Sequence, residues 1–311
     1  MRVTVPSLAK LNLDLRVLHK RPDGFHELRT IFQSISLKDT LTIEFNFAKR
    51  TQIDLSSSIE IEDNLVVRSA KLVLDHLKVK AWVRFALSKR IPMGAGLGGG
   101  SSNAAAVLIA LPALAGKSIP LADRVRLAES LGSDVPFFLF GGTAAGLGRG
   151  SELYPLPDQP ARSVLVVATG IHVSTAESYS ALGRNVTSAL TSEAESFILR
   201  EFQTITWMLD DAGLDHLPLK NDFEQAVFGK YKEVSAVARK LQRLGAKPVQ
   251  MTGSGSAVFG VFKTSAAARV AALSFPAGSA FPVRFVSRQK YKGLWRRALG
   301  PAAGASYFAP F

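Results

Sequence analysis

The chain has 311 residues, of which 47% are hydrophobic and 20% are charged, a balance that is typical of a globular protein and excludes a largely disordered one. It contains no cysteine, which excludes disulfides and thiolate zinc sites, and its formal net charge of +13 favours anionic partners. The most apolar windows, residues 104–116 and 135–148, are shorter than the ~18 residues of a membrane helix, and no signal-peptide pattern opens the chain. We therefore expect a cytoplasmic protein without a membrane span.

The N-terminal part of the chain is predicted to consist mostly of strands. In residues 3–18 apolar and polar side chains alternate, and this period of two predicts a strand with one buried face. The sequence RPDG at 21–24 predicts a turn. Further strands are expected within 28–47 and at 81–88, with a helix at 65–77 between them that Asp63 or Asn64 can cap.

A glycine-rich loop begins the segment MGAGLGGGSSNAAA at 93–106, which leads into a helix predicted at about 102–114. Glycine lets backbone N–H groups approach a ligand, and the following helix points its unpaired N–H groups and positive dipole end at the same place. The loop is therefore expected to hold a chain of phosphates. Ser101, Ser102 and Asn103 can cap the helix.

Three common phosphate-binding loops do not fit this segment. Gly94, Gly96 and Gly99 satisfy the G-x-G-x-x-G pattern by letter, but the acids downstream, Asp123 and Glu129, lie in a helical segment instead of at the end of a second strand. A P-loop would need a lysine after the glycines. A protein-kinase loop would need catalytic-loop and metal-binding signatures further along the chain, and these are absent.

The C-terminal half mixes helices and strands without regular alternation. A helix at 121–131 ends at Gly132, and the proline-rich segment 154–160 is the predicted linker between two domains, 1–155 and 156–311. Beyond the linker we expect strands at 163–169 and 257–262, and helices at 175–182, 194–208, 235–244 and 265–273. This pattern favours an α+β fold in two lobes over a doubly wound sheet.

A basic segment lies near the C-terminus. Residues 284–297 contain six Lys or Arg and no acid. A solvated basic tail is one interpretation, and a phosphate or nucleic-acid patch is the other. The chain lacks zinc-finger spacing and the aromatic-rich strand signature of nucleic-acid binders, so nucleic acid is not the expected partner.

Several motifs of the chain occur together, and in this order, in one known family. The segment PMGAGLGGGSSNAAA at 92–106 resembles the second motif of the GHMP kinases, the superfamily of galactokinase, homoserine kinase and mevalonate kinase. Within it, the chain is most similar to the members that act on a cytidyl diphosphate alcohol. The segments that carry this closer resemblance are residues 9–41, LGSDVPFF at 131–138, NDFE at 221–224 and MTGSGSAVFG at 251–260.

The resemblance implies a fold and a reaction. The expected lobes are ribosomal-S5-like (domain 2 type) at the N-terminus and ferredoxin-like at the C-terminus, with the active site between them. The implied reaction is ATP-dependent phosphorylation of the 2-hydroxyl of 4-diphosphocytidyl-2-C-methyl-D-erythritol in the non-mevalonate (MEP) route to isoprenoids. ATP and Mg²⁺ are the expected cofactors, and no metal ligand is assigned, although Ser102 is a candidate. The alternatives are another GHMP kinase, of the mevalonate or homoserine type, and a catalytically silent relative that binds nucleic acid through its basic tail.

The resemblance also implies roles for residues. Asp134 matches the catalytic base, and Lys10 matches the cation beside the base and the substrate hydroxyl; by spacing alone they would be a helix N-cap and a solvated strand lysine. Phe25 would stack on the cytosine, His26 would hydrogen-bond to it and Asn12 would line the same pocket, whereas an isolated Phe-His pair is more typical of core packing and a surface histidine. The GSGS turn at 253–256 would close against the glycine loop. The nucleotide is assigned to Pro92, Met93, Gly94, Ala95, Gly96, Leu97, Gly98, Gly99, Gly100, Ser101 and Ser102.

Overall fold

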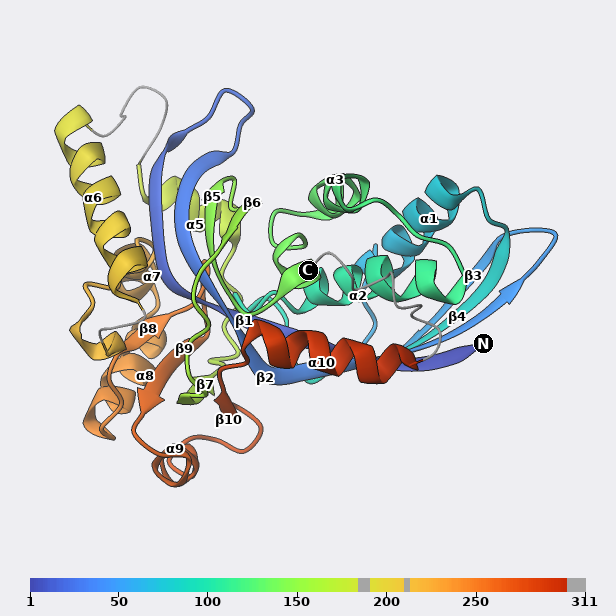
Figure 1. The fold of residues 1–311 in the computed structure, drawn as a ribbon. Coiled ribbons are helices and arrows are strands. Elements are labelled where there is room, and N and C mark those ends of the chain that lie inside the picture. The colour runs from blue at the N-terminus through green and yellow to red at the C-terminus, as the bar shows by residue number, and fades with distance from the viewer. Residues whose placement is uncertain (184–190, 210–212, 301–311) are drawn as a thin grey trace.

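Two β-sheets with helices packed on them form the molecule (Figure 1). The computed structural model describes residues 1–183, 191–209 and 213–300, and within them the first sheet has six strands and the second has four. We call the part built on the six-stranded sheet the first lobe and the part built on the four-stranded sheet the second lobe. The α+β class in two lobes is confirmed.

The first sheet contains most of the N-terminal half of the chain. Its strand order is β3-β4-β2-β5-β6, and β1 pairs with β2. Only β3 and β4 are parallel among the pairs described. The strands are β1 (Arg2–Lys20), β2 (His26–Phe47), β3 (Gln52–Ser57), β4 (Ala81–Ser88), β5 (Thr143–Gly148) and β6 (Glu152–Pro155).

Helices cover one face of this sheet. They are α1 (Leu65–Leu77), α2 (Gly99–Leu114), α3 (Leu121–Leu131) and α4 (Phe137–Phe140). Asn64 caps α1, as predicted, because its side chain accepts a hydrogen bond from the Val66 N–H at 3.0 Å. From residue 102 onward α2 is buried all round, since it packs against α1, α3, α4 and the sheet, and its alanines allow close approach. The glycine loop is thereby attached to a rigid core element.

The second lobe is smaller and holds most of the C-terminal half. Its strand order is β10-β7-β9-β8 and its described pairs are antiparallel. The strands are β7 (Ser163–Val167), β8 (Val249–Met251), β9 (Val258–Phe262) and β10 (Ala280–Arg284). The helices are α5 (Thr175–Ala181), α6 (Ser192–Met208), the 3-10 turn Leu214–His216, α7 (Glu224–Lys230), α8 (Lys232–Arg243) and α9 (Ser265–Ala272).

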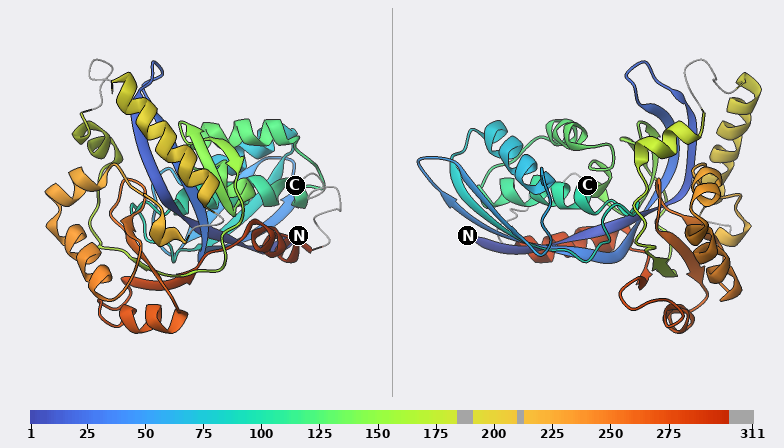
Figure 2. Two further views of the ribbon diagram at one scale, coloured as in Figure 1. Left: turned by 60° about the vertical axis from the view of Figure 1, so that its left-hand side comes forward. Right: turned by 180° about the vertical axis from the view of Figure 1, so that it is seen from behind.

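Strand β1 is buried on both faces, so the expectation of one buried face is wrong. The reason is that the β1–β2 hairpin reaches into the second lobe and lies beside α6 in every view (Figures 1 and 2). There the buried Arg16 side chain donates to Asp14 and to Glu201 of α6, the latter at 2.8 Å. Burial raises the pKa of Asp14 to about 6, although the Arg16 charge opposes the shift. Asp14 and Arg16 therefore face the second lobe and not solvent.

The basic segment near the C-terminus forms a helix, α10 (Arg288–Leu299), and so is not a tail, although four of its six basic residues are exposed to solvent. Its Tyr291, Trp295 and Leu299 side chains are buried in the core of the first lobe, and the Tyr291 hydroxyl donates to the Phe138 carbonyl at 2.6 Å. Although α10 follows the second lobe in sequence, it runs along β1 in the first lobe (Figure 1). The division at 155/156 stays a prediction, and the end of the second predicted domain, residues 301–311, lies outside the described residues.

Most predicted elements are present within a few residues of their expected bounds. Sequence reasoning missed α10 and several short elements: β3, β5, β6, β8, β10, α4, α7 and the 3-10 turn. None of the helices in the described ranges is apolar over a sufficient length to cross a bilayer.

Candidate active site

Three adjoining cavities lie along the glycine loop and the β1–β2 hairpin. The loop cavity, of about 340 Å³, is lined by residues 92–101 together with 61, 63–65, 89 and 103. The central cavity, of about 500 Å³, includes Lys10, Asn12 and Asp134, and shares glycines 94, 96 and 98 with the loop cavity. The hairpin cavity, of about 630 Å³, includes Phe25 and His26 and shares Asp134 with the central cavity. Every predicted nucleotide residue except Ser102 lines the loop cavity.

The glycine loop adopts backbone conformations that other residues rarely take. Gly94, Gly96 and Gly98 have φ of +62°, +77° and +70°. A Cβ on Gly96 would lie 2.1 Å from the Thr252 carbonyl oxygen, and one on Gly98 would lie 2.7 Å from the Phe138 ring. The glycine loop therefore packs between the second lobe and the core of the first lobe. Its residues also line the loop cavity.

The predicted caps of α2 are wrong. The helix begins at Gly99, three residues earlier than expected, and its N-cap is Gly98, which makes no side-chain hydrogen bond. Ser101, Ser102 and Asn103 therefore lie inside the first turns of the helix. Ser102 is buried and its hydroxyl has no hydrogen-bond partner, so the first turn offers a free polar atom beside the unpaired N–H groups of the helix.

A buried polar cluster supports the loop at both ends, and sequence reasoning missed it. The Asp39 carboxylate accepts hydrogen bonds from the Arg90 and Ile91 N–H groups, just before the loop, and from the Asn103 side chain at 3.0 Å, just after it. The Lys89 ammonium pairs with Asp39 and donates to Asn103. Strand β2 supplies Asp39 from a distant part of the sequence, so no local pattern could have indicated it.

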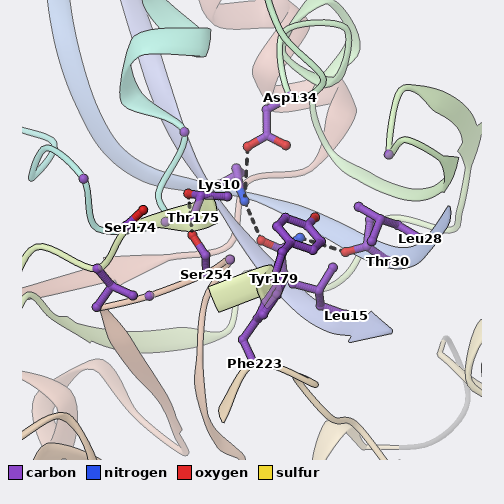
Figure 3. Close-up of a pocket in the computed structure, with 18 of the residues that line it drawn as sticks. Lys10, Leu15, Leu28, Thr30, Asp134, Ser174, Thr175, Tyr179, Phe223 and Ser254 are labelled. Atoms are coloured by element: carbon purple, nitrogen blue, oxygen red, sulfur yellow. Dashed lines mark hydrogen bonds and ion pairs between the residues drawn. The ribbon is translucent and has the colours of Figure 1, made fainter. Parts of the chain in front are cut away.

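The central cavity brings the two predicted catalytic residues together. The Lys10 ammonium lies 3.4 Å from the Asp134 carboxylate, and Figure 3 shows the carboxylate pointing toward it. The Lys10 side chain is 3% exposed and the Asp134 side chain 34%. Lys10 is thus not a solvated strand lysine, and Asp134 does not cap α4, whose N-cap is Pro136. The carboxylate remains open to a ligand, whereas the ammonium is held beneath it.

Asn12 lies next to Lys10 on the same side of β1. Its side-chain oxygen accepts a hydrogen bond from the Lys10 ammonium, and its amide donates to the Thr30 hydroxyl at 2.7 Å. The side chain is buried and lines the central cavity, not the hairpin cavity that holds Phe25 and His26. Asn12 therefore lies on the Lys10 side of the site, apart from the cavity of Phe25 and His26.

The hairpin cavity contains one cation–π pair and one pair of stacked rings. The Arg149 guanidinium lies 3.5 Å from the centroid of the Phe25 ring, and the His26 ring stacks on Tyr179 at 4.4 Å. A base that stacks on Phe25 would have to use its other face or displace Arg149. Burial, with the Asp134 charge adding to it, raises the pKa of the Tyr179 phenol. Arg149 and Tyr179 were missed because they come from the β5–β6 turn and from α5, far from the hairpin in sequence.

Comparison with known proteins identifies the family of the chain. Residues 64–142 match the model of the GHMP kinase N-terminal domain, and residues 198–277 match the GHMP kinase C-terminal domain. A protein of Solibacter usitatus named 4-diphosphocytidyl-2-C-methyl-D-erythritol kinase is 52% identical over 293 residues, which is 94% of this chain and 92% of that protein. The chain belongs to the GHMP kinases.

Solved structures place it within this superfamily. The structure of a 4-(cytidine 5'-diphospho)-2C-methyl-D-erythritol kinase is 35% identical, with a TM-score of 0.73 over 92% of this chain and 99% of that one. A homoserine kinase of Cytophaga hutchinsonii has a TM-score of 0.66 over 92% of this chain and 95% of its own, but is only 16% identical, so it shows the GHMP kinase fold alone.

Proposed function

We propose that this GHMP kinase transfers the γ-phosphoryl group of ATP to the 2-hydroxyl of 4-diphosphocytidyl-2-C-methyl-D-erythritol. The observation that carries the proposal is the Lys10–Asp134 pair, because it lies where the loop cavity and the hairpin cavity meet through the central one. A substrate with a base in the hairpin cavity would bring its alcohol end to Asp134. ATP in the loop cavity would bring its terminal phosphate to the same place.

The pair can do the chemistry that the transfer requires. The Asp134 carboxylate would accept the proton of the 2-hydroxyl, and the buried Lys10 ammonium would stabilise the alkoxide oxygen as it attacks. Asn12 would keep the ammonium in place through the hydrogen bond that it accepts. The backbone N–H groups of the loop and the start of α2 would hold the phosphates of ATP, the phosphate donor of this family.

Mg²⁺ is part of the proposal. Among the described residues no group of three His, Asp or Glu side chains could hold a metal. Mg²⁺ bound with a nucleotide usually needs only one or two protein oxygens, and the Ser102 hydroxyl is a buried oxygen without a partner. Ser102 is the candidate ligand, although it lines none of the three cavities, and the ion would neutralise charge on the phosphates. A cytoplasmic location stays a prediction.

The hairpin cavity favours the cytidyl substrate over mevalonate or homoserine. A small aliphatic acid would leave the aromatic pairs of this cavity, Phe25 with Arg149 and His26 with Tyr179, without a function. The presence of Lys10 and Asp134 as a pair argues against a catalytically silent relative.

A coupled ADP-release assay tests the proposal. The purified protein is incubated with ATP, Mg²⁺ and, in separate reactions, the cytidyl substrate, mevalonate or homoserine. We expect turnover with the cytidyl substrate alone. Turnover with mevalonate or homoserine only would overturn the substrate assignment, and no turnover with any of the three would overturn the kinase assignment.

A further inference from the structure

The NDFE segment at 221–224 lies on the second-lobe side of the central cavity and has no role in the reaction described above. Asn221 is buried, and its side-chain amide donates to the carbonyl oxygens of Met251 at 2.8 Å and Gly253 at 2.9 Å. Its side-chain oxygen accepts a hydrogen bond from the Phe223 N–H at 3.0 Å. The Glu224 carboxylate accepts from the Met251 N–H at 2.7 Å. Two side chains thus hold the short segment 251–253 by three hydrogen bonds.

The segment that they hold touches both halves of the proposed active site. Thr252 is fully buried, and its hydroxyl oxygen accepts a hydrogen bond from the Asn12 N–H of β1 at 3.0 Å. The same hydroxyl lies 3.3 Å from the Gly96 carbonyl oxygen of the glycine loop, to which it donates. One hydroxyl group therefore joins the strand that carries Lys10 to the loop that lines the nucleotide side.

The backbone around Thr252 packs against the glycine loop so closely that neither Gly96 nor Gly253 leaves free space for a Cβ atom. A Cβ on Gly96 would lie 2.1 Å from the Thr252 carbonyl oxygen, and a Cβ on Gly253 would lie 3.0 Å from the Gly96 Cα. The Ala257 N–H donates to the Ala95 carbonyl oxygen at 3.2 Å, which adds a direct contact between the two glycine turns. A shift of the 251–253 segment would move the loop as well.

We propose that Asn221 and Glu224 are positioning residues that hold Thr252 between β1 and the glycine loop, and so set the place of the ATP phosphates relative to the Lys10–Asp134 pair. This inference rests on the proposed function. Among the hydrogen bonds and ion pairs of the described residues, those of Asn221 and Glu224 do not reach Lys10 or Asp134, and the effect passes through Met251, Thr252 and Gly253. Phosphoryl transfer depends on an in-line arrangement, and a misplacement of about 1 Å can cost about 10²-fold in rate.

The first experiment separates positioning from folding. Asn221→Asp replaces the donated amide by an oxygen that faces two carbonyl oxygens, and Glu224→Ala removes the acceptor of the Met251 N–H. We expect kcat to fall about 10- to 100-fold in each, with the KM for the cytidyl substrate changed less than about threefold, because the hairpin cavity does not include residues 251–253. Glu224→Gln keeps an acceptor oxygen and should restore most of the turnover.

The matched control is Asp222→Ala in the same motif. Asp222 accepts a hydrogen bond from the Val17 N–H of β1 at 2.9 Å, away from the 251–253 segment. Its removal costs a side-chain hydrogen bond of the same motif that does not involve residues 251–253. If Asp222→Ala lowers kcat as much as Asn221→Asp at equal thermal stability, the positioning role is wrong.

A double-mutant cycle tests the path through Thr252. Thr252→Val removes the hydroxyl at nearly constant volume, whereas Thr252→Ser keeps it. If Asn221 acts through Thr252, the Asn221→Asp/Thr252→Val variant should lose no more turnover than the more impaired single variant. Losses that multiply would overturn the inference. Calorimetric binding of a non-hydrolysable ATP analogue distinguishes the failure of the two proposals. If the wild-type protein binds the analogue but phosphorylates none of the substrates, the proposed function is wrong. If the variants keep both the wild-type affinity for the analogue and the wild-type kcat, the positioning role is wrong.

Discussion

The loop cavity and the hairpin cavity are built from different parts of the chain. The loop cavity is lined largely by one continuous segment, residues 92–101, and half of that segment is glycine, which offers only backbone. The hairpin cavity is lined by residues from five separate places, most of them with side chains: 20–28, 101, 133–134, 149 and 175–180. A backbone site accepts any ligand with the right phosphate geometry, and a side-chain site selects among bases. We infer that the loop side sets the reaction class and the hairpin side sets the substrate.

The largest loss of turnover is expected at the central cavity, where the loop cavity and the hairpin cavity meet. Lys10→Ala or Asp134→Asn should lower kcat by about 10²- to 10³-fold, the scale of losing one electrostatic stabiliser of a transition state. Both changes act after the ligands are bound, so the KM values should change much less. Steady-state kinetics with either substrate varied measures this.

Lys38→Ala is the matched control for Lys10. Lys38 also lies in the first sheet, on β2, but its side chain is exposed. Its loss should leave kcat unchanged. Near-normal turnover in purified Lys10→Ala and Asp134→Asn would remove the reason to place catalysis at this junction.

Addition of one methyl group should damage the loop side. In Gly96→Ala the new Cβ would meet the Thr252 carbonyl oxygen at 2.1 Å, and the +77° φ is unfavourable for alanine. We expect the loop to move and kcat/KM for ATP to fall about 10²-fold. Gly116→Ala is the control, because its φ of +63° is equally strained but nothing lies within 4 Å of its Cβ. Equal losses in the two variants would mean that backbone strain, and not the contact between the lobes, is the cause.

The same contrast explains how much could be read from the sequence. The glycine loop, the turn at 21–24 and the amphipathic helix α1 are local patterns, and the structure has them where they were predicted. Lys10 and Asp134 could be named because each lies in a recognisable motif. Their partnership across 124 residues of sequence separation (134 − 10) was implied by resemblance, and not by periodicity.

Most of the parts that were missed depend on contacts between distant segments. Asp39 looked like an ordinary strand residue, yet it supports both ends of the glycine loop. The alternation in β1 indicated one buried face, because a sequence pattern cannot show that a second lobe covers the polar side. The helix α10 in the basic segment was also missed. Its apolar residues, Tyr291, Trp295 and Leu299, are spaced four apart among the charged residues.

A smaller effect is expected on the hairpin side. Tyr179→Ala removes the ring that stacks on His26 and packs edge-on against Phe223. The His26 ring should then lose its fixed position in the hairpin cavity, where the cytosine is proposed to bind. We expect KM for the cytidyl substrate to rise about 10-fold, the scale of one aromatic–base contact, with KM for ATP unchanged. Tyr179→Phe keeps the ring and should retain a near-normal KM. A KM for ATP that rises in parallel would contradict the separation of the two sides.

The smallest effect is a pH dependence of the stability of the protein, which comes from Glu224, the residue that holds Met251. Burial raises the pKa of Glu224 from 4.5 to about 7, and the Met251 N–H only partly opposes this. A carboxyl whose pKa is raised on folding stabilises the native state fully below pH 4.5, and this contribution is lost as the pH rises through 7. Glu224→Gln does not titrate. We expect the free energy of unfolding of the wild type, relative to that of Glu224→Gln, to fall by about 1 kcal/mol between pH 5 and pH 8. A fully buried group would lose ~1.4 kcal/mol for each unit by which its pKa is raised. The expected loss is smaller because part of the Glu224 side chain reaches solvent. Urea denaturation of both proteins at the two pH values measures the difference, and a constant difference would show that Glu224 is already ionised at pH 5 in the folded protein.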